Sequence, residues 1–305
     1  MTKSIDKVVA QVGGIILGKE HQIRLAVACL LARGHLLIED IPGVGKTMLA
    51  HALAASLGLG FQRIQFTSDL LPADILGVSI YNRDTGGFQF HPGPIFAQVV
   101  LADEVNRATP KAQSALLEAM EENQVTIDSE TRRLPQPFFV IATQNPSYQI
   151  GTFPLPESQL DRFLMRVQLG YPDGEAERAL LQGQDRRDLL EQLTPCMKIE
   201  QLIELQQHAQ KIHASSALLD YVQALVNHTR RAADYLNGLS PRAALALLRV
   251  ARAWALMEGR EHIVPEDLQT VLPGVVGHRL IPTGEFTRAN GVDVAAHLIK
   301  QVAIP

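Results

Sequence analysis

The chain has 305 residues and a formal net charge of −4, a length that allows about two domains that fold without disulfides or metals. Two unpaired-looking cysteines, Cys29 and Cys196, and the lack of a signal or spanning segment near the N-terminus favour a cytoplasmic protein without membrane insertion. The acidic balance excludes a surface that is basic overall, so nucleic acid is an unfavoured partner unless a local basic patch exists.

Residues 1–35 carry apolar residues at helical spacing in two runs, Ile5 to Val12 and Ile23 to Leu31. We expect a pair of core helices here. The short apolar segment between the two runs ends at Gly18. Its functional alternative is an apolar seat for a nucleotide base beside Gly18.

The stretch from Leu36 to Leu57 predicts a strand, a loop and a helix in succession. Backbone amides and a helix N-terminus converge on one small volume in such a unit, which is the geometry that holds a phosphate. Lys46 adds a mobile cation, and the Thr47 hydroxyl suits a Mg²⁺ that bridges phosphates. The residues that we expect to bind the nucleotide here are Pro42, Gly43, Val44, Gly45, Lys46, Thr47 and Met48.

The match to the phosphate-loop pattern G-x-x-x-x-G-K-[ST] is incomplete, because Asp40 takes the place of the first glycine. A carboxylate next to a triphosphate is unfavourable unless it points away. The alternative for the loop as a whole is a Gly-rich turn that caps an ordinary helix.

Four further apolar runs, at residues 61–66, 99–102, 138–143 and 163–169, predict strands, which makes five with residues 36–38. Segments of crossover length separate them, so we expect an α/β fold with a mainly parallel sheet covered on both faces. Ligands of such sheets bind beyond the carboxyl ends of the strands.

Polar side chains stand at those ends. Asp103 and Glu104 follow one strand and Asn145 follows another. Two acids after a buried strand suit a Mg²⁺ partner, Asp103, and a base that activates water, Glu104. Polar residues that merely end a strand are the alternative for the acids, and an Asx turn before Pro146 competes with a contact to water or phosphate for Asn145.

Two stretches, about 77–93 and 123–135, look like β-hairpins inserted into the core, as decoration or as partner contacts. A short helix precedes Arg162, for which the alternative is a surface salt bridge to Asp161 or Glu157.

Beyond a turn-forming stretch with Pro172 and Gly174 the sequence is helical, at roughly 175–185, 199–212, 216–233, 241–257 and 265–272. Ser240 and Pro241 are typical of a helix start. Arg242 then lies in a first turn, where a cation is unfavourable unless an anion faces it.

In this order the motifs resemble those of the MoxR family of AAA+ ATPases over nearly the whole chain. The matching segments are residues 40–47, 101–108, 142–146, 155–157, 161–163 and 240–242. The resemblance implies a P-loop AAA+ core with a five-stranded sheet, residues 1–172, and an all-helical lid, residues 173–305. It also implies ATP or ADP with Mg²⁺ at the junction of core and lid and at the boundary between subunits of a homo-oligomeric ring, expected to be a hexamer.

The resemblance further assigns roles. Lys46 and Thr47 match the first nucleotide motif, Asp103 and Glu104 the second, and Asn145 the sensor. Arg162 matches the arginine given to a neighbouring subunit's ATP, and Arg242 the lid sensor at the terminal phosphate.

The expected function is ATP hydrolysis coupled to chaperone-like remodelling of a protein client, such as one with a von Willebrand factor A domain. The alternatives are a nucleotide-gated binding scaffold with negligible turnover and a nucleic-acid motor, which Arg132 and Arg133 on the second hairpin suggest.

Overall fold

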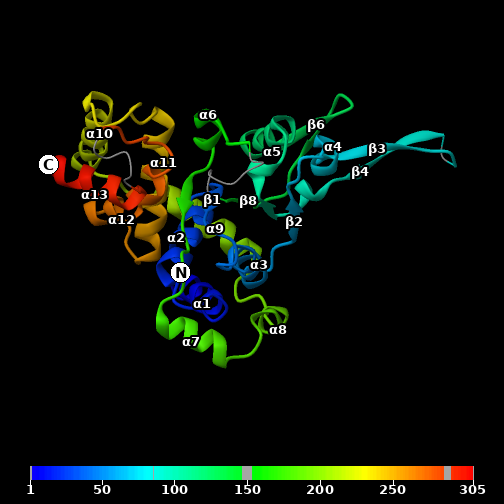
Figure 1. Cartoon of the computed structure of the whole chain (residues 1–305), viewed down its shortest axis with the longest axis horizontal. Helices are drawn as coiled ribbons and strands as arrows, with labels where there is room; N and C mark the ends of the chain where they lie inside the picture. The colour runs from blue at the N-terminus through cyan, green and yellow to red at the C-terminus, as the bar shows by residue number, and fades with distance from the viewer. Residues whose placement is uncertain (1, 85, 146–152, 285–289, 305) are drawn as a thin grey trace.

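A five-stranded sheet forms the centre of the computed structural model, which describes residues 2–84, 86–145, 153–284 and 290–304 (Figure 1). Its strands run parallel in the order β2–β5–β8–β1–β9. Their bounds are β1 Leu36–Glu39, β2 Phe61–Gln65, β5 Val99–Asp103, β8 Phe139–Gln144 and β9 Met165–Val167. The predicted α/β fold with five mainly parallel strands is confirmed.

β9 is shorter than the predicted strand over residues 163–169. The reason is that the amide of Leu169 donates to the Asp40 carboxylate, at 2.6 Å, instead of continuing the ladder with β1. The last pairing of β9 with β1 therefore joins Val167 to Ile38.

Side chains of the central strands alternate between two hydrophobic clusters, as the two-residue period of a strand requires. On one face, Ile38 and Ile141 pack with the helices α1 (Thr2–Gly13), α2 (Glu20–Leu31) and α3 (Lys46–Ser56). On the other face, Leu37 and Val140 pack with α4 (Pro72–Leu76) and α5 (Pro110–Glu122). Because both faces are covered, the central strands β1, β5 and β8 are apolar along most of their length and end in polar residues at the sheet edge.

Two antiparallel hairpins form at the places that the sequence indicates. The first joins β3 (Gly77–Asn82) to β4 (Gly87–Pro92), and the second joins β6 (Gln124–Ile127) to β7 (Glu130–Arg133). The first hairpin reaches far out from the sheet in Figure 1, and Phe88 on it is 76% exposed. The guanidinium of Arg132 lies 4.1 Å from the ring centre of Phe90, so the two hairpins contact each other.

Short helical turns connect these elements: η1 (Pro94–Phe96), η2 (Val105–Arg107) and α6 (Glu157–Leu160). After β9 the described chain is helical. The helices are α7 (Gly174–Gln182), α8 (Arg186–Glu191), α9 (Ile199–Lys211), α10 (Ser216–Arg231), α11 (Pro241–Met257), α12 (Pro265–Val276) and α13 (Gly291–Gln301). The sequence analysis did not predict α8 or α13. In Figure 1, α7 and α8 lie beside α1 and α3, while α10 to α13 form a separate group.

The expected start of α11 is correct: the Ser240 side chain accepts a hydrogen bond from the amide of Ala243, and Pro241 is the first helical residue. Within the described ranges, no helix combines the length and the apolar character that crossing a membrane requires.

Candidate nucleotide-binding site

The loop between β1 and α3 has the backbone of an anion site. Gly43 and Gly45 adopt φ values of 85° and 95°, a conformation that side chains with a Cβ rarely take. α3 has no side-chain cap, and its first hydrogen bond runs from the Leu49 amide to the Gly45 carbonyl. The amides of Lys46, Thr47 and Met48 therefore have no acceptor within the helix and point out of its N-terminus, where an anion is stabilised.

Asp40 points away from this loop. Its carboxylate accepts hydrogen bonds from three backbone amides, those of Ile41 at 2.8 Å, Leu169 at 2.6 Å and Gly170 at 2.7 Å. The departure from the phosphate-loop pattern is thus explained: Asp40 fastens the start of the loop to the end of β9 and puts no carboxylate where a phosphate would bind.

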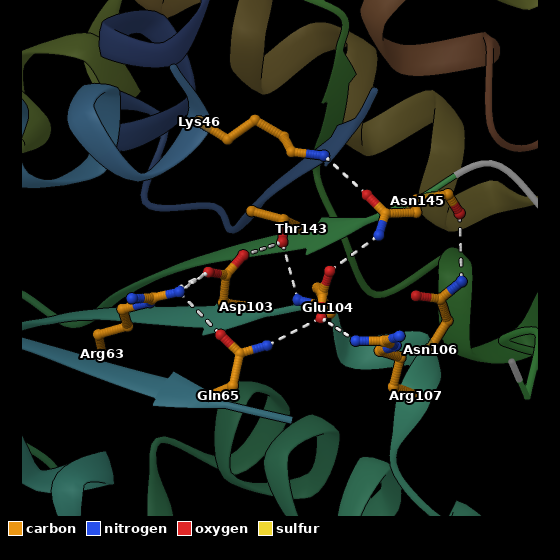
Figure 2. Close-up of polar contacts among 9 residues, drawn as sticks. All are labelled: Lys46, Arg63, Gln65, Asp103, Glu104, Asn106, Arg107, Thr143 and Asn145. Carbon is orange, nitrogen blue, oxygen red and sulfur yellow. Dashed lines mark hydrogen bonds and ion pairs between the residues drawn. The ribbon is translucent and has the colours of Figure 1, made fainter. Parts of the chain in front are cut away.

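Lys46 is buried, with 8% of its surface exposed, and its ammonium group donates to the Asp40 carbonyl at 2.6 Å. It also donates to Asn145 Oδ1 at 3.2 Å, as Figure 2 shows. Burial lowers the pKa of Lys46, and the carboxylates of Asp40, Asp103 and Glu104 act in the opposite direction. The lysine is therefore a cation in a poorly solvated place, and a phosphate is the kind of partner that can replace its two neutral acceptors.

Asp103 ends β5 with both carboxylate oxygens engaged. Thr143 donates to Oδ1 at 2.5 Å, and Arg63 of β2 donates to Oδ2 at 2.6 and 3.0 Å (Figure 2). A carboxylate oxygen has two lone pairs, and the Thr143 hydroxyl uses one of those on Oδ1, so Asp103 can still reach a metal ion directly or through water.

Glu104 is held by three side chains. Asn145 donates to Oε1 at 2.9 Å, while Gln65 and Arg107 donate to Oε2 at 2.9 and 2.8 Å (Figure 2). Its backbone is left-handed, with φ 56° and ψ 47°, which costs a residue with a side chain about 1–3 kcal/mol. Strain of this kind concentrates at functional sites. Asn145 links the two halves of this edge, because its amide contacts both Lys46 and Glu104.

A Mg²⁺ fits this edge only together with a ligand. Within the described ranges, no group of three or more His, Cys, Asp or Glu side chains could hold a metal. Thr47, in the first turn of α3, and Asp103 are the oxygen donors that the sequence analysis assigns to the ion, so phosphate oxygens and water would complete the shell. When bound, the ion would neutralise phosphate charge.

Gly18 lies at the rim of a hollow of about 660 Å³ between α1 and α2. Its φ is 68°, and a Cβ there would come within 2.9 Å of the Cβ of Ala176 in α7. Ile16 also lines the hollow and is the nearest side chain to Gly45, 3.6 Å from where a Cβ would stand. The expected seat for a base thus adjoins the phosphate loop. Of the other loop residues, Pro42 is exposed, whereas Val44 and Met48 pack against the core.

Arg162 and Arg242 lie elsewhere. Arg162 Nε is 3.0 Å from Glu121 Oε2, and Arg242 donates to Glu121 Oε1 at 2.5 Å. A hollow of about 390 Å³ surrounds them, lined also by Gly34 and His35, which come just before β1. The two arginines are therefore at the amino edge of the sheet, whereas Lys46 and Glu104 are at the carboxyl edge.

The residue before Arg162 is clamped to the helical part of the chain. The side chain of Arg279 is 5% exposed and donates to the Asp161 carboxylate at 2.6 Å and to the carbonyls of Asp161 and Phe163 at 3.1 and 2.7 Å. Burial lowers the pKa of Arg279, and the contact with Asp161 opposes that shift. Ser240 donates to the other Asp161 oxygen at 3.1 Å. Core and lid thus present Arg162 and Arg242 as one surface.

The structure brings five predicted site residues to one edge of the sheet: Lys46, Thr47, Asp103, Glu104 and Asn145. It places Arg162 and Arg242 side by side on Glu121, away from that edge. Four residues of β1, about 13 Å of strand, separate the two places. The Asx-turn alternative for Asn145 involves Pro146, which lies outside the described residues.

The sequence analysis missed the partners of the acids and of the arginines. Arg63 and Gln65 lie on either side of Ile64 in β2, and Gln65 pairs with Asp103 in the register of β2 and β5. These polar residues in a strand beside the acidic one were the available signal. Thr143 and Glu121 gave no such signal in the sequence. A threonine in a strand and a glutamate on a helix are common, and no neighbouring residue distinguishes these two.

Comparisons with known proteins agree with this geometry. The model of the ATPase family associated with various cellular activities (AAA) matches residues 35–165, and the model of the AAA lid domain matches residues 227–298. A crystal structure of a candidate ATPase from Cytophaga hutchinsonii matches with a TM-score of 0.91 and 37% identity, covering 100% of this chain and 96% of that one.

Among curated relatives, YeaC of Bacillus subtilis is 44% identical, over 99% of this chain and 95% of YeaC. Chaperone MoxR1 of Mycobacterium tuberculosis is 39% identical, over 92% of this chain and 76% of that protein. Protein MoxR of Methylorubrum extorquens is 32% identical, over 97% of this chain and 93% of that protein. The chain belongs to the MoxR family of AAA+ ATPases, with an AAA core followed by an AAA lid.

Proposed function

We propose that this chain binds ATP with Mg²⁺ and hydrolyses it to ADP and phosphate at the interfaces of a homo-oligomeric ring, a hexamer, in the cytoplasm. One observation carries the proposal: the phosphate loop and the acids stand at one edge of the sheet, and two arginines stand at the other. A subunit cannot bring its own arginines to its own loop, so a neighbour's arginines complete each site.

The roles follow from the contacts. A terminal phosphate takes the Lys46 ammonium away from Asn145 Oδ1 and the Asp40 carbonyl. Glu104 orients the attacking water and accepts its proton, and Asn145 holds Glu104 in place. Arg162 and Arg242 of the next subunit neutralise the charge that spreads over the transferred phosphoryl group.

The hydrolysis cycle is proposed to remodel a protein client. Chaperone MoxR1, a relative at 39% identity, is named for such a role. The exposed β3–β4 hairpin is a surface that a client could contact, and a protein with a von Willebrand factor A domain is the client class that we propose. The nucleic-acid alternative loses support because Arg132 is stacked on Phe90 and ion-paired with Glu130.

The test measures ATP binding and phosphate release for four proteins. The wild type should hydrolyse ATP. Lys46→Ala should lose ATP binding, whereas Glu104→Gln should still bind ATP while hydrolysis falls about 10²- to 10⁴-fold. Lys300→Ala, at an exposed position on α13, is the matched control and should behave as the wild type.

A wild-type protein with no affinity for ATP or ADP would overturn the proposal. Binding without turnover, with and without a client, would leave only the nucleotide-gated scaffold. The client part is tested separately, by measuring whether ATP-loaded Glu104→Gln retains a purified von Willebrand factor A domain protein from the same cell. Failure to retain any such protein would remove this client class.

A further inference from the structure

Glu121 joins the two arginines of the amino edge through one carboxylate. Oε2 lies 3.0 Å from Arg162 Nε and Oε1 lies 2.5 Å from a terminal nitrogen of Arg242. We propose that Glu121 is a positioning residue that presents Arg162 and Arg242 together to the nucleotide of a neighbouring subunit. This inference rests on the proposed function.

The place of Glu121 in its own helix is unfavourable. It lies in the last turn of α5, which has no basic residue there, and a carboxylate at a helix C-terminus opposes the helix dipole. Local helix energetics therefore do not account for a glutamate at this position. The two guanidinium partners, from segments 41 and 121 residues away in the sequence, do.

The backbone under Glu121 is held firmly. His35 Nε2 lies 3.1 Å from the Met120 carbonyl, and the Leu134 amide donates to the carbonyl of Asn123 at 3.0 Å. Groups on a fixed backbone can orient a flexible side chain more accurately than groups on a free loop. Glu121 is thus a rigid anchor between two long side chains.

Glu121 contacts the two arginines through different nitrogens. Its ion pair with Arg162 is made through Nε, whereas Arg242 contacts it through one terminal nitrogen. The two terminal nitrogens of a guanidinium form the fork that matches two oxygens of a phosphate. The ion pair through Nε therefore does not use that fork on Arg162, whereas on Arg242 Glu121 takes one of the two nitrogens.

The charges around the pair give a second reason why Glu121 would position the two arginines. The hollow around the pair is lined by five arginines and two carboxylates, and one of the carboxylates, Asp161, is taken by Arg279 and Ser240. Without Glu121 the guanidinium groups of Arg162 and Arg242 would repel each other and regain their rotamer freedom. Holding both close together removes that cost before the nucleotide arrives.

The experiment compares Glu121→Ala, Glu121→Gln and Glu122→Ala in steady-state ATP hydrolysis. Glu121→Ala should lower kcat roughly 10- to 100-fold while KM for ATP changes less than about twofold, because the subunit's own phosphate loop is intact. Glu121→Gln, with one acceptor oxygen, should fall between. Glu122→Ala removes the same charge from an exposed neighbour in the same turn and should match the wild type.

Mixing shows where the defect acts. Glu121→Ala subunits have a sound phosphate loop and a faulty arginine face, whereas Lys46→Ala subunits have the reverse. Mixed rings should therefore recover hydrolysis above either protein alone. The thermal unfolding midpoint of Glu121→Ala should stay at the wild-type value, since Glu121 is about one third exposed, at 34% of its side chain.

Three results would overturn the inference. The first is a rise in kcat for Glu121→Ala, which would mean that Glu121 inhibits hydrolysis. The second is a loss of kcat that Lys46→Ala subunits do not rescue, and the third is an unchanged kcat for Glu121→Ala when the wild type is active. The last result is distinct from failure of the proposed function, in which the wild type itself hydrolyses no ATP.

Discussion

The two edges of the central sheet differ in how they hold their charged groups. At the carboxyl edge, Asp103, Glu104 and Lys46 are joined by short hydrogen bonds to Thr143, Asn145 and other neighbours, and most of them are buried (Figure 2). At the amino edge, 31% of the Arg162 side chain and 48% of the Arg242 side chain remain exposed. The charged groups of the carboxyl edge are thus satisfied within the chain, whereas the arginines of the amino edge remain partly exposed, as expected of a surface that contacts a partner.

The largest expected effect comes from breaking the amino edge. Arg162→Ala should lower hydrolysis by about 10³- to 10⁵-fold, or roughly 4–7 kcal/mol, because an arginine supplied from a neighbour stabilises the transition-state charge. ATP binding at the mutant's own loop should persist. Phosphate release and nucleotide binding, measured on the same preparation, check both statements.

Arg178→Ala, at an exposed position on α7, is the matched control and should retain full activity. Mixing Arg162→Ala with Lys46→Ala should restore part of the activity, since each mutant lacks what the other offers. If rings that demonstrably contain both proteins stay inactive, Arg162 does not act on a neighbour's site.

The carboxyl edge was largely predictable from the sequence, and the amino edge was not. Asp103 and Glu104 follow a buried strand directly, and a parallel sheet gathers such strand ends at one edge. The pairing of Arg162 and Arg242 on Glu121 joins three distant segments, and no local pattern encodes it. The salt bridge expected as an alternative, from Arg162 to Asp161 or Glu157, differs from the observed partner because Asp161 is held by Arg279.

The fold shows the same division. Strands that are buried on both faces were correctly predicted, since their apolar runs are unambiguous. α8 has six residues, four of them charged and two of them leucines, of which Leu190 is buried, and it packs on α3. α13 has a full capping box at Asn290, a local signal that was present and was not used.

A smaller effect should follow from releasing Asp40, which ties the carboxyl edge to the end of β9. Asp40→Ala leaves the amides of Leu169 and Gly170 without their acceptor, and such a loss costs about 1–3 kcal/mol. Urea unfolding should show this loss of stability. ATP affinity should fall as well, because the Asp40 carbonyl and the loop that follows it lose their anchor.

Asp84→Ala, at an exposed position of the first hairpin, serves as the control and should change neither quantity. An Asp40→Ala protein with normal stability and tighter ATP binding would mean that the carboxylate opposes the nucleotide after all.

Acid should lower the free energy of unfolding through His35, which lies at the amino edge directly before β1. Its Nδ1 accepts the Val140 amide at 3.0 Å, so in the neutral ring Nε2 carries the proton and donates to Met120. Burial lowers the pKa of His35 to about 4 from 6.5. The unfolded chain therefore binds a proton first, and the free energy of unfolding should fall by about 2 kcal/mol between pH 7 and pH 5.

Urea unfolding at several pH values measures this slope. Burial also lowers the pKa of His278 well below its usual value, so His35→Gln should flatten the slope only in part. His91→Gln, on the exposed hairpin, is the control for removing a histidine. A wild-type stability that rises on acidification to pH 5 would contradict the neutral assignment of His35.

The smallest effect on basal activity should come from the β3–β4 hairpin, which belongs to neither edge. Phe88 is 76% exposed and contacts Tyr81 edge-on, with ring centres 5.4 Å apart. Phe88→Ser should change stability by no more than about 0.5 kcal/mol, as exposed substitutions do. Hydrolysis without a client should match the wild type, because no nucleotide contact is proposed for the hairpin, whereas stimulation of hydrolysis by a client should weaken.

Thr126→Ala, on the second hairpin, controls for altering a projecting strand. Equal stimulation of wild type and Phe88→Ser by the same client would exclude Phe88 from the contact, and a lower basal rate would show that the hairpin helps to assemble the two edges.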